Sequence, residues 1–295
     1  MNGNISLGLG ERARKGRRSR GRARDSLNIL EVLVEVLREH HPMTVRQAYY
    51  QLVSRQVIKN SRSSYQKISG LLVDARKDST IPWEWVEDRL RRPRAPSMWD
   101  DPADFVEDAC QAYRRDVWAT QREYLETWLE KDALSGIFED VLRPYGVTLN
   151  VGRGYDGWDS IRNAAARYRE RFKDHGRATI LYFGDFDPSG EDMARSLRDR
   201  LSFFGVETEL IKIALTAEDI ERYHLPPDPA KLADTRAAAF IEAHGDVSVE
   251  LDALPVDVLC ERIITEVESR MDLAALAAVQ EQEQAEREHI REVLR

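Results

Sequence analysis

The amino-acid sequence predicts an α/β plus α fold, in which an N-terminal helical segment precedes a segment built on a parallel sheet. Three observations support this division: helical spacing of apolar residues before residue 95, a proline-containing stretch over residues 91–102, and alternating strand and helix patterns beyond it. The chain has 295 residues, 42% of them hydrophobic, which is enough for two folded domains.

Three amphipathic helices are expected in the N-terminal segment. The first covers Ser26–Arg38, the second opens at Thr44, and the third covers Ser64–Arg76. The short aromatic segment Ile81–Val86 is typical of the strand or wing that closes a small DNA-binding module. Three helices and a closing strand predict a helix-turn-helix-type unit.

Strand and helix patterns alternate after the prolines. Strands are expected at Tyr124–Leu129, Val147–Val151, Thr179–Phe183 and Glu207–Ile213, with helices between them at Asp132–Leu142, Ser160–Phe172 and Glu191–Phe204. This order predicts a mainly parallel sheet covered on both faces, with its chemistry at the carboxyl ends of the strands. Residues 258–271 and 273–295 are expected to form a helical tail.

Basic residues cluster at the N-terminus of an otherwise acidic chain. The formal net charge is −8, but residues 1–24 carry +7 and leave −15 for residues 25–295. A basic arm is typical of nucleic-acid-binding proteins because each cation near a phosphate releases counterions. A solvated tail is the alternative interpretation. The predicted DNA-binding residues of the arm are Arg12, Arg14, Lys15, Arg17, Arg18, Arg20, Arg22 and Arg24.

Several classes of protein are disfavoured by composition. No stretch approaches the roughly 18 apolar residues that cross a bilayer, and we expect no membrane association. The N-terminus has no apolar signal segment. The two cysteines, Cys110 and Cys260, are too few and too far apart for a disulfide framework or a CxxC zinc site. A cytoplasmic location is the resulting expectation.

Carboxylates follow two of the predicted strands. Asp185 and Asp187 come directly after the third strand and point the same way because side chains alternate along an extended chain. Glu130 follows the first strand, which can be a neighbour of the third in a parallel sheet. Three converging carboxylates predict a hard cation such as Mg²⁺. The alternative is that Asp187 only caps the next helix.

Several motifs resemble the A subunit of topoisomerase VI and its relatives that make meiotic double-strand breaks. The glutamate and the Asp-x-Asp pair look like a Toprim domain, the Mg²⁺-binding fold of topoisomerases, primases and some nucleases. Further similarity lies in TVRQAYY (Thr44–Tyr50), GRGY (Gly152–Tyr155), DFDPSG (Asp185–Gly190) and IALTAEDIERYHLP (Ile213–Pro226). The resemblance covers roughly Ser26–Arg270, and the short chain is closest to the compact viral and plasmid-borne members called Mini-A.

This resemblance implies a winged-helix domain followed by a Toprim domain. By position, Tyr50 matches the nucleophile and Arg46 the motif arginine, and the Mg²⁺ ligands are Glu130, Asp185 and Asp187. In the family the tyrosine and the metal come from different subunits. The resemblance therefore implies a homodimer acting on double-stranded DNA, of prokaryotic, plasmid or viral origin.

The implied activity is DNA cleavage of the type IIB topoisomerase kind. Attack by Tyr50 on the backbone would form a 5′-phosphotyrosyl link and a double-strand break. A phenol with a pKa of about 10 needs a nearby cation, and Arg46 precedes Tyr50 by one helical turn. Lys131, Arg62 and Arg76 are further candidate DNA contacts, whereas Glu250 and Asp252 are interpreted as structural.

Two alternative functions, and a separate ATPase chain as a partner, are considered beside this hypothesis. The chain could be a Toprim nuclease in which metal-bound water attacks, or a DNA-binding protein without catalysis. No ATPase phosphate-binding motif is present, so a partner ATPase would be a separate chain. The expected domains are a basic disordered arm (1–24), a winged helix (25–95), a linker (96–116), a Toprim domain (117–245) and C-terminal helices (246–295).

Overall fold

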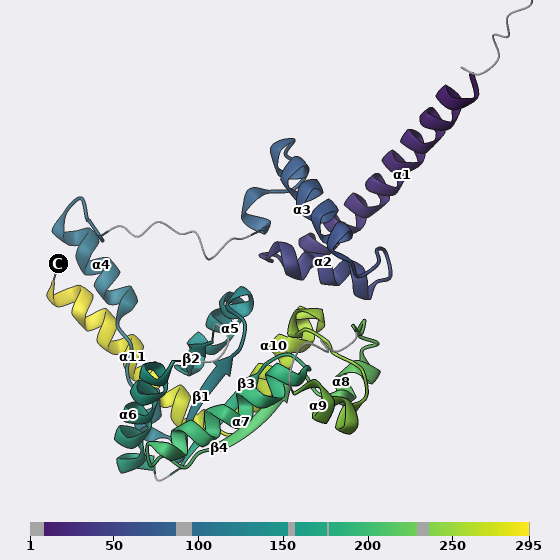
Figure 1. The fold of residues 1–295 in the computed structure, drawn as a ribbon. Coiled ribbons are helices and arrows are strands. Elements are labelled where there is room, and N and C mark those ends of the chain that lie inside the picture. Colours follow the sequence, from purple (N-terminus) through teal and green to yellow (C-terminus); the bar gives the residue numbers. More distant parts are fainter. Residues whose placement is uncertain (1–8, 87–95, 153–156, 176, 229–235, 295) are drawn as a thin grey trace, which may run out of the picture. The chain divides into compact units, whose positions relative to one another are not determined.

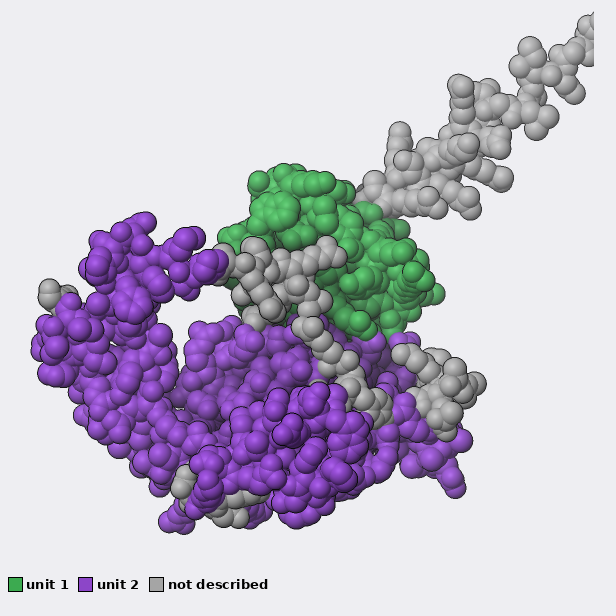
Figure 2. Space-filling model, turned by 60° about the vertical axis from the view of Figure 1, so that its left-hand side comes forward, with its two compact units in different colours: residues 1–88 green, residues 89–295 purple. Residues whose placement is uncertain are grey.

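A computed structural model describes residues 9–86, 96–152, 157–175, 177–228 and 236–294 of the chain. Within helix α1, it describes side chains only from residue 25 onward. The chain divides into two compact units, residues 1–88 and 89–295 (Figure 2). Each unit is described by itself.

Unit 1 is built from three helices, α1 (Leu9–His40), α2 (Val45–Ser54) and α3 (Arg62–Lys77). Helix α1 begins 17 residues before the expected Ser26, so the segment expected to be a disordered arm is helical from Leu9 onward. The physical reason lies in its composition: arginine, lysine and alanine are good helix formers, and no proline interrupts the run.

The core of unit 1 comes from one apolar face of each helix. Its fully buried side chains include Leu33 and Leu37 of α1, Leu52 of α2, and Ile68 and Leu72 of α3. Leu33 and Leu37, like Ile68 and Leu72, lie four positions apart, as residues on one face of a helix do.

The expected wing over Ile81–Val86 is not a strand. Pro82 precedes a short 3₁₀ turn, η1 (Trp83–Trp85), and the Val86 backbone pairs with Met43 in an isolated parallel bridge. Proline has no N–H to donate to a strand ladder, which accounts for the turn. The described part of unit 1 therefore has three helices and no ladder of strands.

Unit 2 contains a four-stranded parallel sheet, which confirms the predicted mixed α/β architecture. The strands are β1 (Tyr124–Leu129), β2 (Thr148–Val151), β3 (Ala178–Phe183) and β4 (Glu209–Ala214), in the order β2-β1-β3-β4. The two central strands are buried along their whole length and the outer two are more exposed. Burial along the whole length is typical of parallel strands covered on both faces.

Helices connect and cover these strands (Figure 1). The connections are α5 (Ser135–Leu142), α6 (Trp158–His175) and α7 (Pro188–Phe203). Helix α6 packs on α7, while α5 packs on α10 (Val256–Glu268). Right-handed crossovers with this strand order place the two pairs on opposite faces. Two short helices, α8 (Ala217–Arg222) and α9 (Ala237–His244), follow β4.

The expected linker over 96–116 contains a helix, α4 (Pro102–Ala112). Asp101 caps it and Pro102 occupies its first turn, where a missing N–H costs no hydrogen bond. The proline that indicated a linker thus starts a helix. Helix α4 packs on the C-terminal helix α11 (Leu273–Val293).

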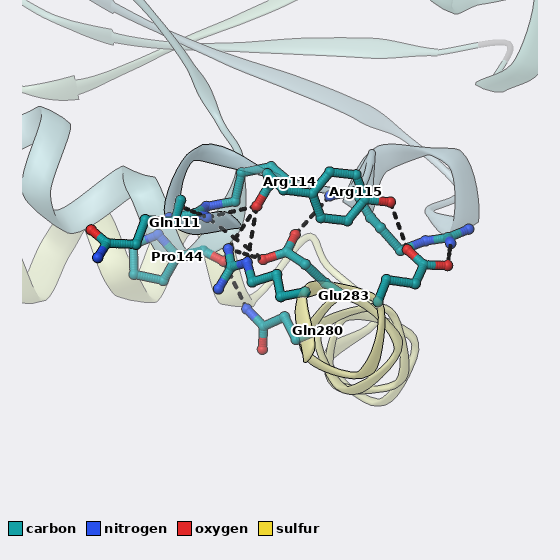
Figure 3. A network of polar contacts seen from close by, with 9 residues as sticks. Gln111, Arg114, Arg115, Pro144, Gln280 and Glu283 are labelled. Atoms are coloured by element: carbon teal, nitrogen blue, oxygen red, sulfur yellow. Dashed lines mark hydrogen bonds and ion pairs between the residues drawn. The ribbon is translucent and has the colours of Figure 1, made fainter. Parts of the chain in front are cut away.

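A polar network fixes the end of α4 to α11 (Figure 3). The buried Glu283 of α11 accepts the backbone N–H of Arg115 at 2.7 Å. Gln280, one turn earlier on α11, donates to the carbonyl of Pro144 at 2.9 Å. The chain entering β1 is therefore held against the C-terminal helix.

Candidate active site

One candidate site, within unit 2, lies at the carboxyl ends of β1 and β3. These strands are neighbours, as the sequence analysis required, and their pairing runs from Tyr124–Ala178 to Leu129–Phe183. The pairing continues one step further, because the Glu130 N–H donates to the carbonyl of Phe183 at 2.9 Å. Glu130 and Asp185 therefore leave the sheet at the same edge.

Backbone hydrogen bonds hold one oxygen of each carboxylate. Glu130 Oε2 accepts the N–H of Asp185 at 2.9 Å, and Asp185 Oδ1 accepts the N–H of Leu251 at 2.7 Å. Asp187 caps α7 through Oδ1, which accepts the N–H of Gly190 at 2.7 Å. Among the described residues, none donates a hydrogen bond to the second oxygen of these carboxylates.

Two glycines allow this close packing. A Cβ on Gly190 would lie 2.3 Å from the carbonyl oxygen of Asp185, and a Cβ on Gly184 would lie 2.6 Å from Glu130 Oε2. Contacts under 3.0 Å are essentially never seen for real Cβ atoms. The glycines of the Gly184–Gly190 turn are needed because backbone and carboxylates approach one another there.

Burial and neighbouring carboxylates disfavour the charged form of Glu130 and Asp185 in this cluster. Burial, with the charge of Asp185 as the next cause and that of Asp187 adding to it, raises the pKa of Glu130 to about 7. Burial also raises the pKa of Asp185, although the neighbouring Lys131 opposes the shift. Carboxyl groups whose pKa is raised in this way are typical of functional sites. A bound cation would relieve the repulsion between the carboxylates.

The donor chemistry fits Mg²⁺, which binds carboxylate oxygens and water. Glu130, Asp185 and Asp187 would hold the ion through the oxygens that the backbone does not use. In the part of the chain that the structure describes, however, no three His, Cys, Asp or Glu side chains are grouped as a metal site. The structure thus brings the three residues into one cluster without drawing their oxygens around one point.

Lys131 lies inside this cluster. Its ammonium contacts Asp185, Glu250 and Asp252 at 3.0, 3.1 and 2.9 Å. The Lys131 ammonium thus contacts three carboxylates of its own chain, whereas the sequence predicted that it contacts a DNA backbone. Glu250 and Asp252 are expected from the sequence to be structural. The one sequence feature that could have indicated their part in the cluster is their spacing, which equals that of Asp185 and Asp187.

A separate candidate site is a hollow in unit 1 around Tyr50. It is lined by Arg46, Tyr49, Tyr50, Asn60, Ser61, Arg62 and Tyr65, with a volume of about 200 Å³. Tyr50 is only 6% exposed, yet two arginines line the same hollow. The surroundings of its ring are therefore partly polar and cationic.

Tyr49 has a structural role in forming this hollow. Its hydroxyl donates to Asn60 Oδ1 at 2.6 Å and accepts the N–H of Ser61 at 2.8 Å. Its ring meets those of Tyr50 and Tyr65 edge to face, with centroids 5.0 and 5.4 Å apart. These contacts join α2 to the segment that starts α3, so that Tyr50 and both arginines line one hollow.

The remaining predicted DNA contacts have different outcomes. The Arg76 guanidinium donates from Nε to the carbonyl of Leu72 at 3.1 Å and stacks on Trp83, with 4.8 Å from Cζ to the ring centroid. It is thus engaged within unit 1. The side chains of the basic residues in 12–24, and residues 153–155 of the GRGY motif, lie outside the described residues.

Comparisons with models of known protein families, with curated proteins and with solved structures found no match. Among the helices in the described parts of the chain, none combines the length and apolar character needed to cross a membrane.

Proposed function

We propose that this protein is an Mg²⁺-dependent, DNA-cleaving transesterase similar to the A subunit of topoisomerase VI, with a winged-helix unit and a Toprim unit. The observation that carries the proposal is the hollow that Tyr50 lines together with Arg46 and Arg62. A hollow lined by a tyrosine and two cations suits a nucleophile directed at a phosphodiester.

The reaction of Tyr50 is a transesterification. Its oxygen forms a bond to phosphorus, the bond from phosphorus to the 3′ oxygen breaks, and that oxygen takes up a proton while the phenol loses its own. The product is a 5′-phosphotyrosyl link that keeps the bond energy for resealing. Arg46 favours the phenolate and binds the phosphate, because a cation beside a phenol lowers its pKa.

The carboxylate cluster supplies the second half of the proposal. Mg²⁺ held by Glu130, Asp185 and Asp187 would neutralise charge on the phosphate and the leaving oxygen. The chain's own contribution is to fix one oxygen of each carboxylate with backbone N–H groups, so that the side chains are positioned in advance. We propose that a homodimer brings Tyr50 of one protomer to the cluster of its partner on double-stranded DNA.

One observation favours a second candidate, hydrolysis by unit 2 alone. Tyr50 is nearly buried, whereas the cluster at Glu130 and Asp185 lies entirely within unit 2. In that reaction water attacks the phosphodiester and Tyr50 is structural. The products would be free 5′ phosphates.

A cleavage assay distinguishes these functions. Supercoiled plasmid is incubated with the protein and Mg²⁺, denatured, and analysed with and without protease. Protein bound to 5′ ends that is lost in Tyr50→Phe supports transesterification, and Tyr65→Phe is the matched control because Tyr65 lines the same hollow. Free 5′ phosphates from both variants would support hydrolysis, and a gel shift of uncut plasmid would contradict both.

A further inference from the structure

Lys131 joins three chain segments that are far apart in sequence. It follows β1, Asp185 follows β3, and Glu250 and Asp252 belong to the turn around η6 (Leu251–Ala253). The Lys131 ammonium lies 2.9–3.1 Å from one oxygen of each of these three carboxylates. One ammonium thus has three anionic ligands.

These charges meet largely away from solvent. The side chains of Lys131 and Asp185 are 17% and 10% exposed, and that of Asp252 is fully buried. Charges removed from water in this way need compensation, and loss of one partner leaves an uncompensated charge that costs several kcal/mol. Without the ammonium, three carboxylates would face one another.

The same contacts determine which oxygen Asp185 can offer. Oδ1 accepts the Leu251 N–H at 2.7 Å and lies 3.0 Å from the Lys131 ammonium in an ion pair. Oδ2 accepts no hydrogen bond from the described residues. A second cation approaching Oδ1 would be repelled by the ammonium that is already there.

We propose that the Lys131 ammonium is the built-in cation of the Asp185, Glu250 and Asp252 group. It supplies the positive charge that these three carboxylates would otherwise take from a divalent ion, and it leaves only Oδ2 of Asp185 for the metal ion of the proposed function. The role of Lys131 as a cation rests on the contacts above, and the role of Oδ2 as a metal ligand rests on the proposed function. Lys131 is therefore a positioning residue.

Lys212 provides a matched control in the same neighbourhood. Its ammonium contacts one carboxylate, Glu191, at 2.6 Å, and the backbone carbonyl of Asp185 at 3.1 Å. Its side chain is 14% exposed, close to the 17% of Lys131. Removal of Lys212 leaves a single acid and cannot create a group of three.

The test compares wild type, Lys131→Met and Lys212→Met for binding of Mn²⁺, followed by electron paramagnetic resonance of the free ion. We expect Lys131→Met to bind one more Mn²⁺ per chain than wild type. In EDTA its Tm should fall by roughly 5–10 °C, and millimolar Mg²⁺ should restore it, because the ion replaces the lost ammonium. Lys212→Met should show neither effect.

Equal Mn²⁺ stoichiometry in Lys131→Met and wild type, or a Tm that Mg²⁺ does not restore, would overturn the proposal. The double variant Lys131→Met/Asp252→Asn addresses poor folding, because it removes one acid together with the cation. The double variant should lose the additional Mn²⁺ site. A double variant that still binds the additional Mn²⁺ would also overturn the proposal. Wild type that binds no Mn²⁺, beside Lys131→Met that binds one, supports the role of Lys131 while contradicting the metal-dependent function.

Discussion

The Tyr50 hollow and the carboxylate cluster are assembled over different distances along the chain. The hollow draws all its residues from 46–65. The cluster joins residues that are 55 and 66 positions apart, as in the Glu130–Asp185 and Asp185–Leu251 hydrogen bonds. The hollow therefore depends on two adjacent helices, whereas the cluster depends on the completed sheet and the turn at Leu251.

The largest effect is expected in the cluster, from Glu130→Gln. The amide removes one anionic ligand while keeping the size of the side chain. We expect cleavage to fall at least about 100-fold, because the metal contributes several kcal/mol to such reactions. Binding of DNA, measured by fluorescence anisotropy, should stay within about 2-fold.

Glu139→Gln on the exposed side of α5 is the control for this change. Cleavage that survives in Glu130→Gln, with full Mg²⁺ dependence, would remove Glu130 from the proposed site.

The cluster should also make the stability of the protein depend on pH. The pKa of Glu130 is raised to about 7 in the folded protein, above its unfolded value near 4.5. Between these values the folded state retains a proton that the unfolded state has lost. In EDTA, stability should therefore decrease as pH rises from about 4.5 to 7, by at most about 3 kcal/mol, and then level off.

Urea unfolding at several pH values measures this slope, and Glu130→Gln should flatten it. An equal slope in the variant would contradict the assignment of the raised pKa to Glu130.

Gly190→Ala tests the tight packing of the cluster. The new Cβ would lie 2.3 Å from the Asp185 carbonyl oxygen, so the backbone must move. We expect a loss of about 1–3 kcal/mol in the free energy of unfolding. Gly157→Ala is the matched control in the same unit, because its Cβ meets nothing within 4 Å. Equal stability of the two variants would show that the turn adapts.

The smallest effect is expected at the start of α2, the helix that carries Tyr50, from Thr44→Ala. Thr44 forms a capping box at the start of α2: its Oγ1 accepts the Gln47 N–H at 3.2 Å, and Gln47 Oε1 accepts the Thr44 N–H at 2.7 Å. Loss of the cap should cost about 1 kcal/mol. Thermal unfolding by circular dichroism measures it, with the exposed Thr80→Ala as control. A loss as large as that of Gly190→Ala would contradict the comparison.

Local patterns predicted the sheet well because short segments rich in apolar and β-branched residues alternate with helical patterns along this part of the chain. The bounds of β1 agree with the predicted Tyr124–Leu129, and the predicted neighbours β1 and β3 pair along six residues. Helix α4 was missed because Pro102 was interpreted as a linker residue, although proline is equally suited to a first helical turn. Pro82 had the opposite effect, since it turned an expected strand into η1.

The candidate site was only partly predictable. Glu130 and Asp185 were expected together because strand ends share an edge, and their hydrogen bond confirms that proximity. The contacts of Lys131 with Glu250 and Asp252 span 119 and 121 residues, and no periodicity reports on such distances. Their role depends on the turn at η6, which only the folded chain places beside β3.

Identification of the residue that carries the DNA tests the central claim most directly. Protein trapped on cleaved DNA with Mg²⁺ would be digested with nuclease and trypsin and analysed by tandem mass spectrometry. The account predicts a nucleotide attached through its 5′ phosphate to Tyr50. An adduct on any other residue, or cleaved DNA whose 5′ phosphates carry no peptide, would contradict it.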